Sequence, residues 1–160
     1  MFIVKKERKQ LGYWTKAAMI AAIYALLTIV LAPISYGVIQ VRVSEMLTIL
    51  PFFTVAAVPG LFVGCLIANI VGGHGILDIV FGSLASLLSA LLVARIKIKY
   101  LVPLPPVIIN ALVVGVVLHY VLDFPLHLAI LWVGAGQIIA CYGLGYPLLL
   151  FLEKRREIFD

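Results

Sequence analysis

The sequence predicts an all-α integral membrane protein, a single domain over residues 1–160 that spans the bilayer with six transmembrane helices. Composition is the first reason. Of the 160 residues, 64% are hydrophobic and 12% are charged, and the mean hydropathy is +1.20, so there is too little polar surface to coat a soluble globule. Long apolar stretches separated by charged or turn-like segments are the second reason. No linker rich in Ser, Pro or Gly divides the chain into two domains.

Basic residues set the topology, because eleven of the twelve fall into three separate groups. Lys and Arg in short loops stay on the cytoplasmic side, so the chain should cross the membrane an even number of times between consecutive groups. Both termini are therefore predicted to be cytoplasmic, in a multi-pass protein of the cell membrane. The groups are Lys5, Lys6, Arg8, Lys9 and Lys16; Arg95, Lys97 and Lys99; and Lys154, Arg155 and Arg156.

The first predicted helix covers Ala17 to Ala32 and is expected to be retained. Basic residues precede it, as they do in a signal peptide, but no convincing small-residue cleavage site interrupts the apolar run. Its stretch "TKAAMIAAIYALL" spaces small residues four apart, which allows another helix to approach closely. That helix can belong to the same bundle or to a separate membrane subunit. The stripe comprises Ala17, Ala21 and Ala25, with Ala18 and Ala22 beside it.

The second and third helices are predicted to be short, because residues 45–71 must cross twice. As one helix these residues would extend about 40 Å, enough for a single crossing, whereas two full crossings need about 60 Å. A single crossing would place the basic group around Lys97 outside, against the charge rule. We therefore expect two short helices that meet at Val58 to Gly60 and are shielded from lipid by the longer helices.

The last three helices are predicted over Leu77 to Ala94, Val107 to Val121 and Ala129 to Leu152, the last two separated by the turn-like "DFPLH". This topology collects acidic residues at the outward helix ends. They are Glu45, Asp78 and Asp123, accompanied by Arg42 and by His74, His119 and His127.

Glu45 is the most costly of these acids, because an ionised carboxylate near hydrocarbon costs at least about 2.5 kcal/mol. It either pairs with Arg42, three residues earlier on the same helical face, or faces a ligand. Asp78 either caps the fourth helix or belongs to the same site. Asp123 is most easily a loop residue at the membrane interface.

Amides inside the apolar helices form a second polar set, because each needs a hydrogen-bond partner in hydrocarbon. Each can join neighbouring helices, but together with Glu45 they suit the edge of a heteroaromatic ring. Stacking faces can come from Tyr142, Tyr146, Trp132 and Phe124, and the alternative places these aromatics in the core or the interfacial belt. The predicted substrate-binding residues are Arg42, Glu45, Asn69, Asp78, Asn110, Gln137 and Tyr142.

Catalysis and metal binding have weaker support in the sequence. It contains no GxSxG, GxxxxGK[ST] or paired-carboxylate motif, so we expect no enzyme, no ATP hydrolysis by this chain and no cofactor. The three histidines leave an outward-facing metal-ion transporter subunit as an alternative, although no compact signature such as HExxH is present and no metal site is predicted. Cys65 and Cys141 are expected to pack as small hydrophobes, and no nucleic-acid partner is expected.

Several stretches resemble the QueT family of queuosine-precursor transporters: "QVRVSEMLTILPFF", "VPGLFVGCLIANIVGG", "DIVFGSLASLLSALLVAR" and "PLPPVIINALVVGVVL". The resemblance runs from the first helix to the last. It implies the bundle of a substrate-binding S component of an energy-coupling factor (ECF) transporter, which takes up a vitamin-like compound. The implied ligand is 7-aminomethyl-7-deazaguanine or a close 7-deazaguanine, and an S component for another vitamin is the alternative.

The resemblance also implies partners and roles. A transmembrane coupling subunit, docked on the alanine stripe, and two cytoplasmic ATPase subunits would supply the energy. Placed on this ligand, Glu45 would accept the two N–H groups of the guanine edge, and Asn69 or Asn110 would read the carbonyl and ring nitrogens. Asp78 would pair with the ammonium group. A structural membrane protein whose polar groups only join helices is the remaining alternative.

Overall fold

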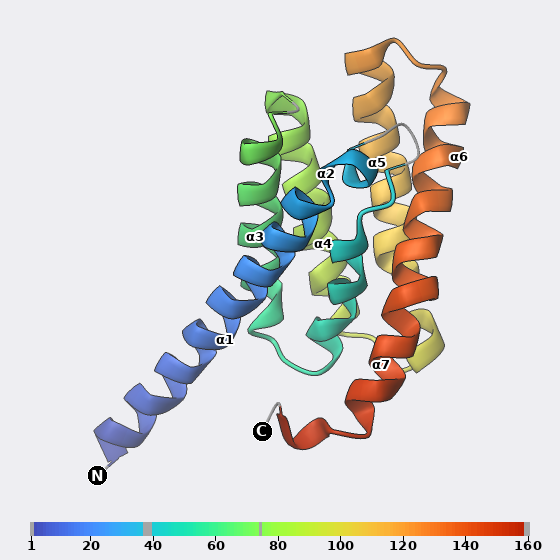
Figure 1. Ribbon diagram of the computed structural model, residues 1–160. Coiled ribbons are helices and arrows are strands. Elements are labelled where there is room, and N and C mark those ends of the chain that lie inside the picture. The colour runs from blue at the N-terminus through green and yellow to red at the C-terminus, as the bar shows by residue number, and fades with distance from the viewer. Residues whose placement is uncertain (1, 37–39, 74, 159–160) are drawn as a thin grey trace.

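The structure, a computed structural model, describes residues 2–36, 40–73 and 75–158 as a bundle of helices with no strand among them (Figure 1). Three segments are long and apolar enough to cross a membrane, and three shorter apolar helices accompany them. The prediction of an all-α membrane bundle with two short helices early in the chain is confirmed. The long segments are Gln10–Val30, Lys99–Leu122 and Leu126–Glu153, and the shorter ones are Val43–Phe52, Ala57–Gly72 and Asp78–Val93.

The first helix, α1 (Phe2–Val30), starts well before the predicted Ala17, because the basic N-terminal segment continues the same helix. It is followed by the single turn α2 (Ala32–Ser35), in which Pro33 occupies one of the first two positions. Proline has no N–H to continue the hydrogen bonding of α1, but it is tolerated in the first turn of a new helix.

The two short helices meet at a different place from the one predicted. The first, η1 (Val43–Phe52), is a 3₁₀-helix, and the second, α3, covers Ala57–Gly72, so the connection is residues 53–56 rather than Val58 to Gly60. Pro59 lies in the first turn of α3, where the backbone N–H groups have no partner within the helix and its missing N–H costs nothing. The "VPG" stretch therefore starts a helix instead of breaking one.

The remaining elements form three helical rods, the shorter Asp78–Val93 and the longer Lys99–Leu122 and Leu126–Glu153. The π-helix η2 (Asp78–Gly82) leads into α4 (Ser83–Val93), and η3 (Lys99–Leu101) precedes α5 (Leu104–Leu122). The last rod is continuous from α6 (Leu126–Gln137) through the π-helix η4 (Ile138–Gly145) to α7 (Tyr146–Glu153), and η5 (Arg156–Ile158) follows. Lys99 Nζ lies 2.6 Å from Glu153 Oε1, so the second and third basic groups share one end of the bundle, as the charge rule predicts.

Within the bundle, η1 occupies the centre, drawn in teal in Figure 1, and contacts α1, α4 and η4. Its residues Ser44, Glu45 and 47–51 are all buried. The outside of the bundle instead exposes large apolar side chains such as Leu26 and Leu131, as a lipid-facing surface should. A ten-residue 3₁₀-helix is too short to face lipid alone, and the surrounding helices provide the predicted shielding.

α1 and α3 approach each other closely through two glycines of α3. A Cβ atom added at Gly60 would lie 2.7 Å from the carbonyl oxygen of Ala17, and one at Gly64 would lie 2.8 Å from that of Ala21. Such small-residue contacts let transmembrane helices pack backbone to backbone. The spacing of the alanines predicts a close contact but does not reveal its glycine partners on α3.

The alanine stripe divides into two parts that the sequence did not distinguish. Ala17, Ala21 and Ala25 are buried against the bundle, whereas Ala18 and Ala22 are exposed. α3 packs against Ala17 and Ala21, so the close helix contact at these two positions is made within the chain. Of the five alanines in the stripe, Ala18 and Ala22 lie on the outer face of α1.

Candidate functional site

The first polar centre surrounds Glu45, whose residue is 1% exposed. The Tyr24 hydroxyl of α1 donates to Glu45 Oε1 at 2.5 Å, and the Asn110 amide of α5 donates to Oε2 at 3.3 Å. The same Asn110 nitrogen lies 3.3 Å from Gln137 Oε1 on α6. We call Tyr24, Glu45, Asn110 and Gln137 the Glu45 cluster. It gathers side chains from four separate segments around one carboxylate.

The backbone of Glu45 is held as firmly as its side chain. The Thr48 hydroxyl donates to the Glu45 carbonyl oxygen at 2.6 Å, and the thiol of Cys141 lies 3.7 Å from the same oxygen. Cys141 also lies 3.5 Å from Gln137 Oε1, so its thiol contacts both the Glu45 backbone and the Gln137 side chain. A fixed carboxylate with fixed amides around it is a preorganised polar site.

The second polar centre is an ion pair between Arg42, at the N-terminal end of η1, and Asp78, at the start of η2. Arg42 Nη2 lies 3.2 Å from Asp78 Oδ2, and the two side chains are 4% and 6% exposed. Asn69 of α3 donates to the Asp78 carbonyl oxygen at 3.0 Å. We call Arg42, Asn69 and Asp78 the Arg42 cluster.

Arg42 is also held by the segment that follows α1. Its Nε donates to the Ser35 carbonyl oxygen at 3.4 Å, and its guanidinium lies 5.2 Å from the centre of the Tyr36 ring, a cation–π distance. The alternative in which Arg42 pairs with Glu45 is wrong, because the guanidinium donates to Asp78 instead. Asp78 does not act as a side-chain cap for its helix either.

The Arg42 cluster has unused hydrogen-bonding capacity. Asn69 Oδ1 and Asp78 Oδ1 are buried and have no hydrogen-bond partner among the described residues. A Cβ atom at Gly82 would lie 3.0 Å from Asn69 Nδ2 and 3.2 Å from Asp78 Oδ1, so glycine leaves room for both side chains. Beside them is a cavity of about 130 Å³, smaller than the roughly 300 Å³ or more of typical ligand sites. Its lining is Tyr36, Gln40, Asp78, Val117, Leu118, Val121 and Leu122.

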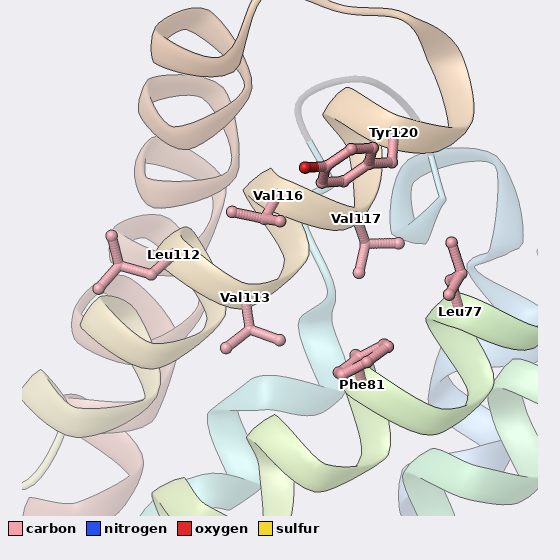
Figure 2. A pocket seen from close by; sticks show the side chains of 7 residues that line it. All are labelled: Leu77, Phe81, Leu112, Val113, Val116, Val117 and Tyr120. Atoms are coloured by element: carbon pink, nitrogen blue, oxygen red, sulfur yellow. The ribbon is translucent and has the colours of Figure 1, made fainter.

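A larger groove of about 600 Å³ lies between the start of the η2–α4 rod and α5, and Figure 2 shows its side chains facing one another from the two segments. Every lining residue except one tyrosine is aliphatic or phenylalanine, so the groove offers almost no hydrogen bonds to a polar ligand. Val117 borders both this groove and the smaller polar cavity. The lining residues are Leu77, Phe81, Leu112, Val113, Val116, Val117 and Tyr120.

Six of the seven predicted binding residues thus fall into the two clusters. The seventh, Tyr142, is partly exposed, and its hydroxyl donates to the Tyr100 carbonyl oxygen at 3.2 Å, at the end of the bundle where α5 begins. The structure does not bring it to either cluster. The sequence spacing of the predicted binding residues does not show that they divide into the Glu45 cluster and the Arg42 cluster.

The histidines of the metal alternative do not converge in the described part of the chain. His119 Nδ1 lies 2.8 Å from the Phe124 carbonyl oxygen, where it closes the turn between α5 and α6. His74 lies outside the described residues. Within residues 2–36, 40–73 and 75–158, no group of three His, Cys, Asp or Glu side chains is placed to hold a metal ion.

Sequence analysis missed Tyr24, Thr48 and Cys141. A signal for Tyr24 was present, because it lies three residues after Ala21 and so shares the inward face of α1. Thr48 also had a local signal, because it lies three residues after Glu45 and a Thr hydroxyl can bond the carbonyl oxygen of the preceding helical turn. Cys141 had none, because it is 96 residues from its Glu45 contact. Both clusters also adjoin a π-helix, η2 at Asp78 and η4 just after Gln137, and π-helical segments are frequent at functional sites.

Comparison with known proteins gives one family and one curated relative. The family model described as QueT transporter matches residues 14–154. A protein named "Queuosine precursor transporter QueT", from Lactococcus lactis subsp. cremoris (strain MG1363), is 39% identical over 89 residues, which are 52% of this chain and 52% of the relative. The match therefore spans about half of that relative's length. No solved structure matches.

Proposed function

Because this chain belongs to the QueT transporter family, we propose that it is the substrate-binding membrane subunit of an importer for a queuosine precursor. The ligand is 7-aminomethyl-7-deazaguanine or a close 7-deazaguanine. The observation that carries this proposal is the Glu45 cluster, a carboxylate and two amides buried inside a membrane bundle. Polar groups at this depth are costly and mark substrate sites in membrane proteins.

The chemistry of the ligand matches the polar groups of the bundle. A deazaguanine presents adjacent N–H donors, a carbonyl acceptor and a planar ring, and the aminomethyl form adds an ammonium group. Glu45 supplies acceptors, and Asn110 and Gln137 supply a donor and an acceptor each. Asn69 and Asp78 hold two further buried acceptor atoms without a partner among the described residues. In this structure the clusters are closed, so the segments around them must separate to admit a ring.

Energy for import comes from other subunits in this proposal: a transmembrane coupling subunit and two cytoplasmic ATPases of an ECF module. The support is the family membership together with the lack of a GxxxxGK[ST] phosphate loop in the sequence. The outer face of α1, with the exposed Ala18 and Ala22, remains the proposed contact for the coupling subunit. Small residues there allow a partner helix to approach closely.

The orientation in the membrane is also a proposal, with both termini and the α4–α5 connection in the cytoplasm. A cysteine replacing Lys97 should react with an impermeant thiol reagent only from the cytoplasmic side, and one replacing His127 only from outside. Both positions are exposed, whereas the native Cys65 and Cys141 are fully buried and should give little background. The opposite pattern of labelling would reverse the topology.

The binding proposal is tested by titrating 7-aminomethyl-7-deazaguanine into the purified full chain and its variants. Asn110→Leu should weaken binding by about tenfold to a hundredfold, because it removes the amide that bonds to both Glu45 and Gln137. Tyr142→Phe, which changes a hydroxyl apart from both clusters, is the matched control and should bind as the wild type does. Failure of the wild type to bind any deazaguanine would refute the proposed function.

A further inference from the structure

The buried charges of the bundle do not cancel. Among the side chains that the structure describes, the buried acidic and basic residues are Arg42, Glu45 and Asp78. Arg42 and Asp78 form an ion pair with each other, and the guanidinium's other contacts are to neutral groups. Glu45 has no ion pair with any described basic residue, and the groups that donate to its carboxylate are a phenol and an amide. The interior thus holds one carboxyl group without an ion-pair partner among the described residues.

A carboxylate in this position has room for one more partner. Its two oxygens together offer about four acceptor positions, and Tyr24 and Asn110 occupy one on each oxygen. Removing a carboxylate from water without a counter-charge is unfavourable by several kcal/mol, and a cation that enters the cluster in good geometry offsets that cost. The protein itself does not supply that cation among its described residues, which leaves the ligand to do so.

We propose that Glu45 is the counter-ion for a cationic group on the ligand, so that the site selects ligands carrying one positive charge; this inference rests on the proposed function. The assignment reverses the roles expected from the sequence, in which Asp78 pairs with the ammonium and Glu45 reads the guanine edge. Asp78 already has its cation in Arg42. Among rings that share the guanine edge, the aminomethyl form is therefore preferred over neutral forms such as the nitrile.

The test compares two ligands that differ in charge at the same ring position. 7-Aminomethyl-7-deazaguanine and 7-cyano-7-deazaguanine are titrated into the full chain in detergent, as wild type and as Glu45→Gln. The wild type should prefer the aminomethyl ring by about tenfold to a hundredfold, the range for a charge-assisted contact. Glu45→Gln should abolish this preference, mainly by lowering the affinity for the aminomethyl ligand.

A charge-neutral change provides the control. The double variant Lys99→Gln/Glu153→Gln removes one positive and one negative charge together from an ion pair outside both clusters, so the Glu45 carboxylate is untouched and the preference should persist. If Glu45→Gln lowers the affinity for both ligands equally, Glu45 bonds to the guanine edge that they share, and the inference is overturned. If Asp78→Asn abolishes the preference and Glu45→Gln does not, Asp78 is the counter-ion and the inference is overturned equally.

The wild-type comparison does not depend on the folding of any variant. Equal affinity of the wild type for the two rings overturns the inference while leaving the proposed function intact, because a deazaguanine is still bound. Binding of neither ring refutes the proposed function and the inference with it. The melting temperature of Glu45→Gln, measured without ligand, shows whether its binding data come from a folded protein.

Discussion

Replacing Arg42 alone by Gln is expected to destabilise the bundle by about 3 to 5 kcal/mol, the cost of breaking a buried ion pair from one side. The change leaves the Asp78 carboxylate buried without its cation, and neither side chain is exposed enough for water to compensate. It also removes the bond to the Ser35 carbonyl oxygen and the contact with the Tyr36 ring. The free energy of unfolding in detergent, followed by circular dichroism, measures the effect.

The double variant Arg42→Gln/Asp78→Asn separates the ion pair from other roles of Arg42. With both charges removed, no buried carboxylate remains unpaired at this position, and most of the lost stability should return. The coupling energy between the two sites should then be large and favourable. A double variant that is as unstable as the sum of the two single variants would show that the pair itself contributes little.

The Arg42–Asp78 pair also shows which features of the site can be predicted from the sequence. Arg42 and Asp78 were both identified, because a charge inside an apolar sequence is conspicuous wherever it lies. Their pairing was not, because the two residues are 36 positions apart and only the packing of η1 beside η2 brings them together. The local rule that joins residues three apart on a helix favoured Glu45 as the partner of Arg42, and it failed because η1 starts at Val43, after Arg42.

The helices themselves were easier to predict than their ends. Hydropathy located the six apolar segments, since any stretch that faces lipid must be apolar along most of its length. Proline was read as a break at Pro59, although the same residue is favourable in the first turn of a helix. Distinguishing these two cases requires knowing where the preceding segment ends, and the 3₁₀ geometry of η1 cannot be read from its composition.

The alanine stripe illustrates a further limit. Small residues at intervals of four predict a close helix contact but do not say whether the partner is within the chain. In the structure the partner of Ala17 and Ala21 is α3, whose small residues Gly60 and Gly64 come about forty residues later. The pairing of two small-residue stripes could be proposed from sequence only by comparing all helices with one another.

The packing of α1 on α3 predicts the second large effect, on stability and on the site together. In Gly64→Ala, the new methyl group would lie 2.8 Å from the Ala21 carbonyl oxygen and 2.9 Å from Tyr24 Cβ, so the two helices must move apart. Overpacking of this kind costs about 1 to 3 kcal/mol. Because Tyr24 also donates to Glu45, the displacement should weaken ligand binding as well.

Gly12→Ala is the matched control, since it adds the same methyl group to α1 at a position where nothing beyond the adjoining helix backbone lies within 4 Å. There the substitution should leave binding unchanged and leave stability unchanged or raise it by about 0.5 to 1 kcal/mol, because alanine favours a helix more than glycine does. Thermal unfolding and ligand titration on both variants measure the contrast. If Gly64→Ala behaves like Gly12→Ala, α1 and α3 are not in backbone contact, and the position of Tyr24 against Glu45 does not depend on that contact.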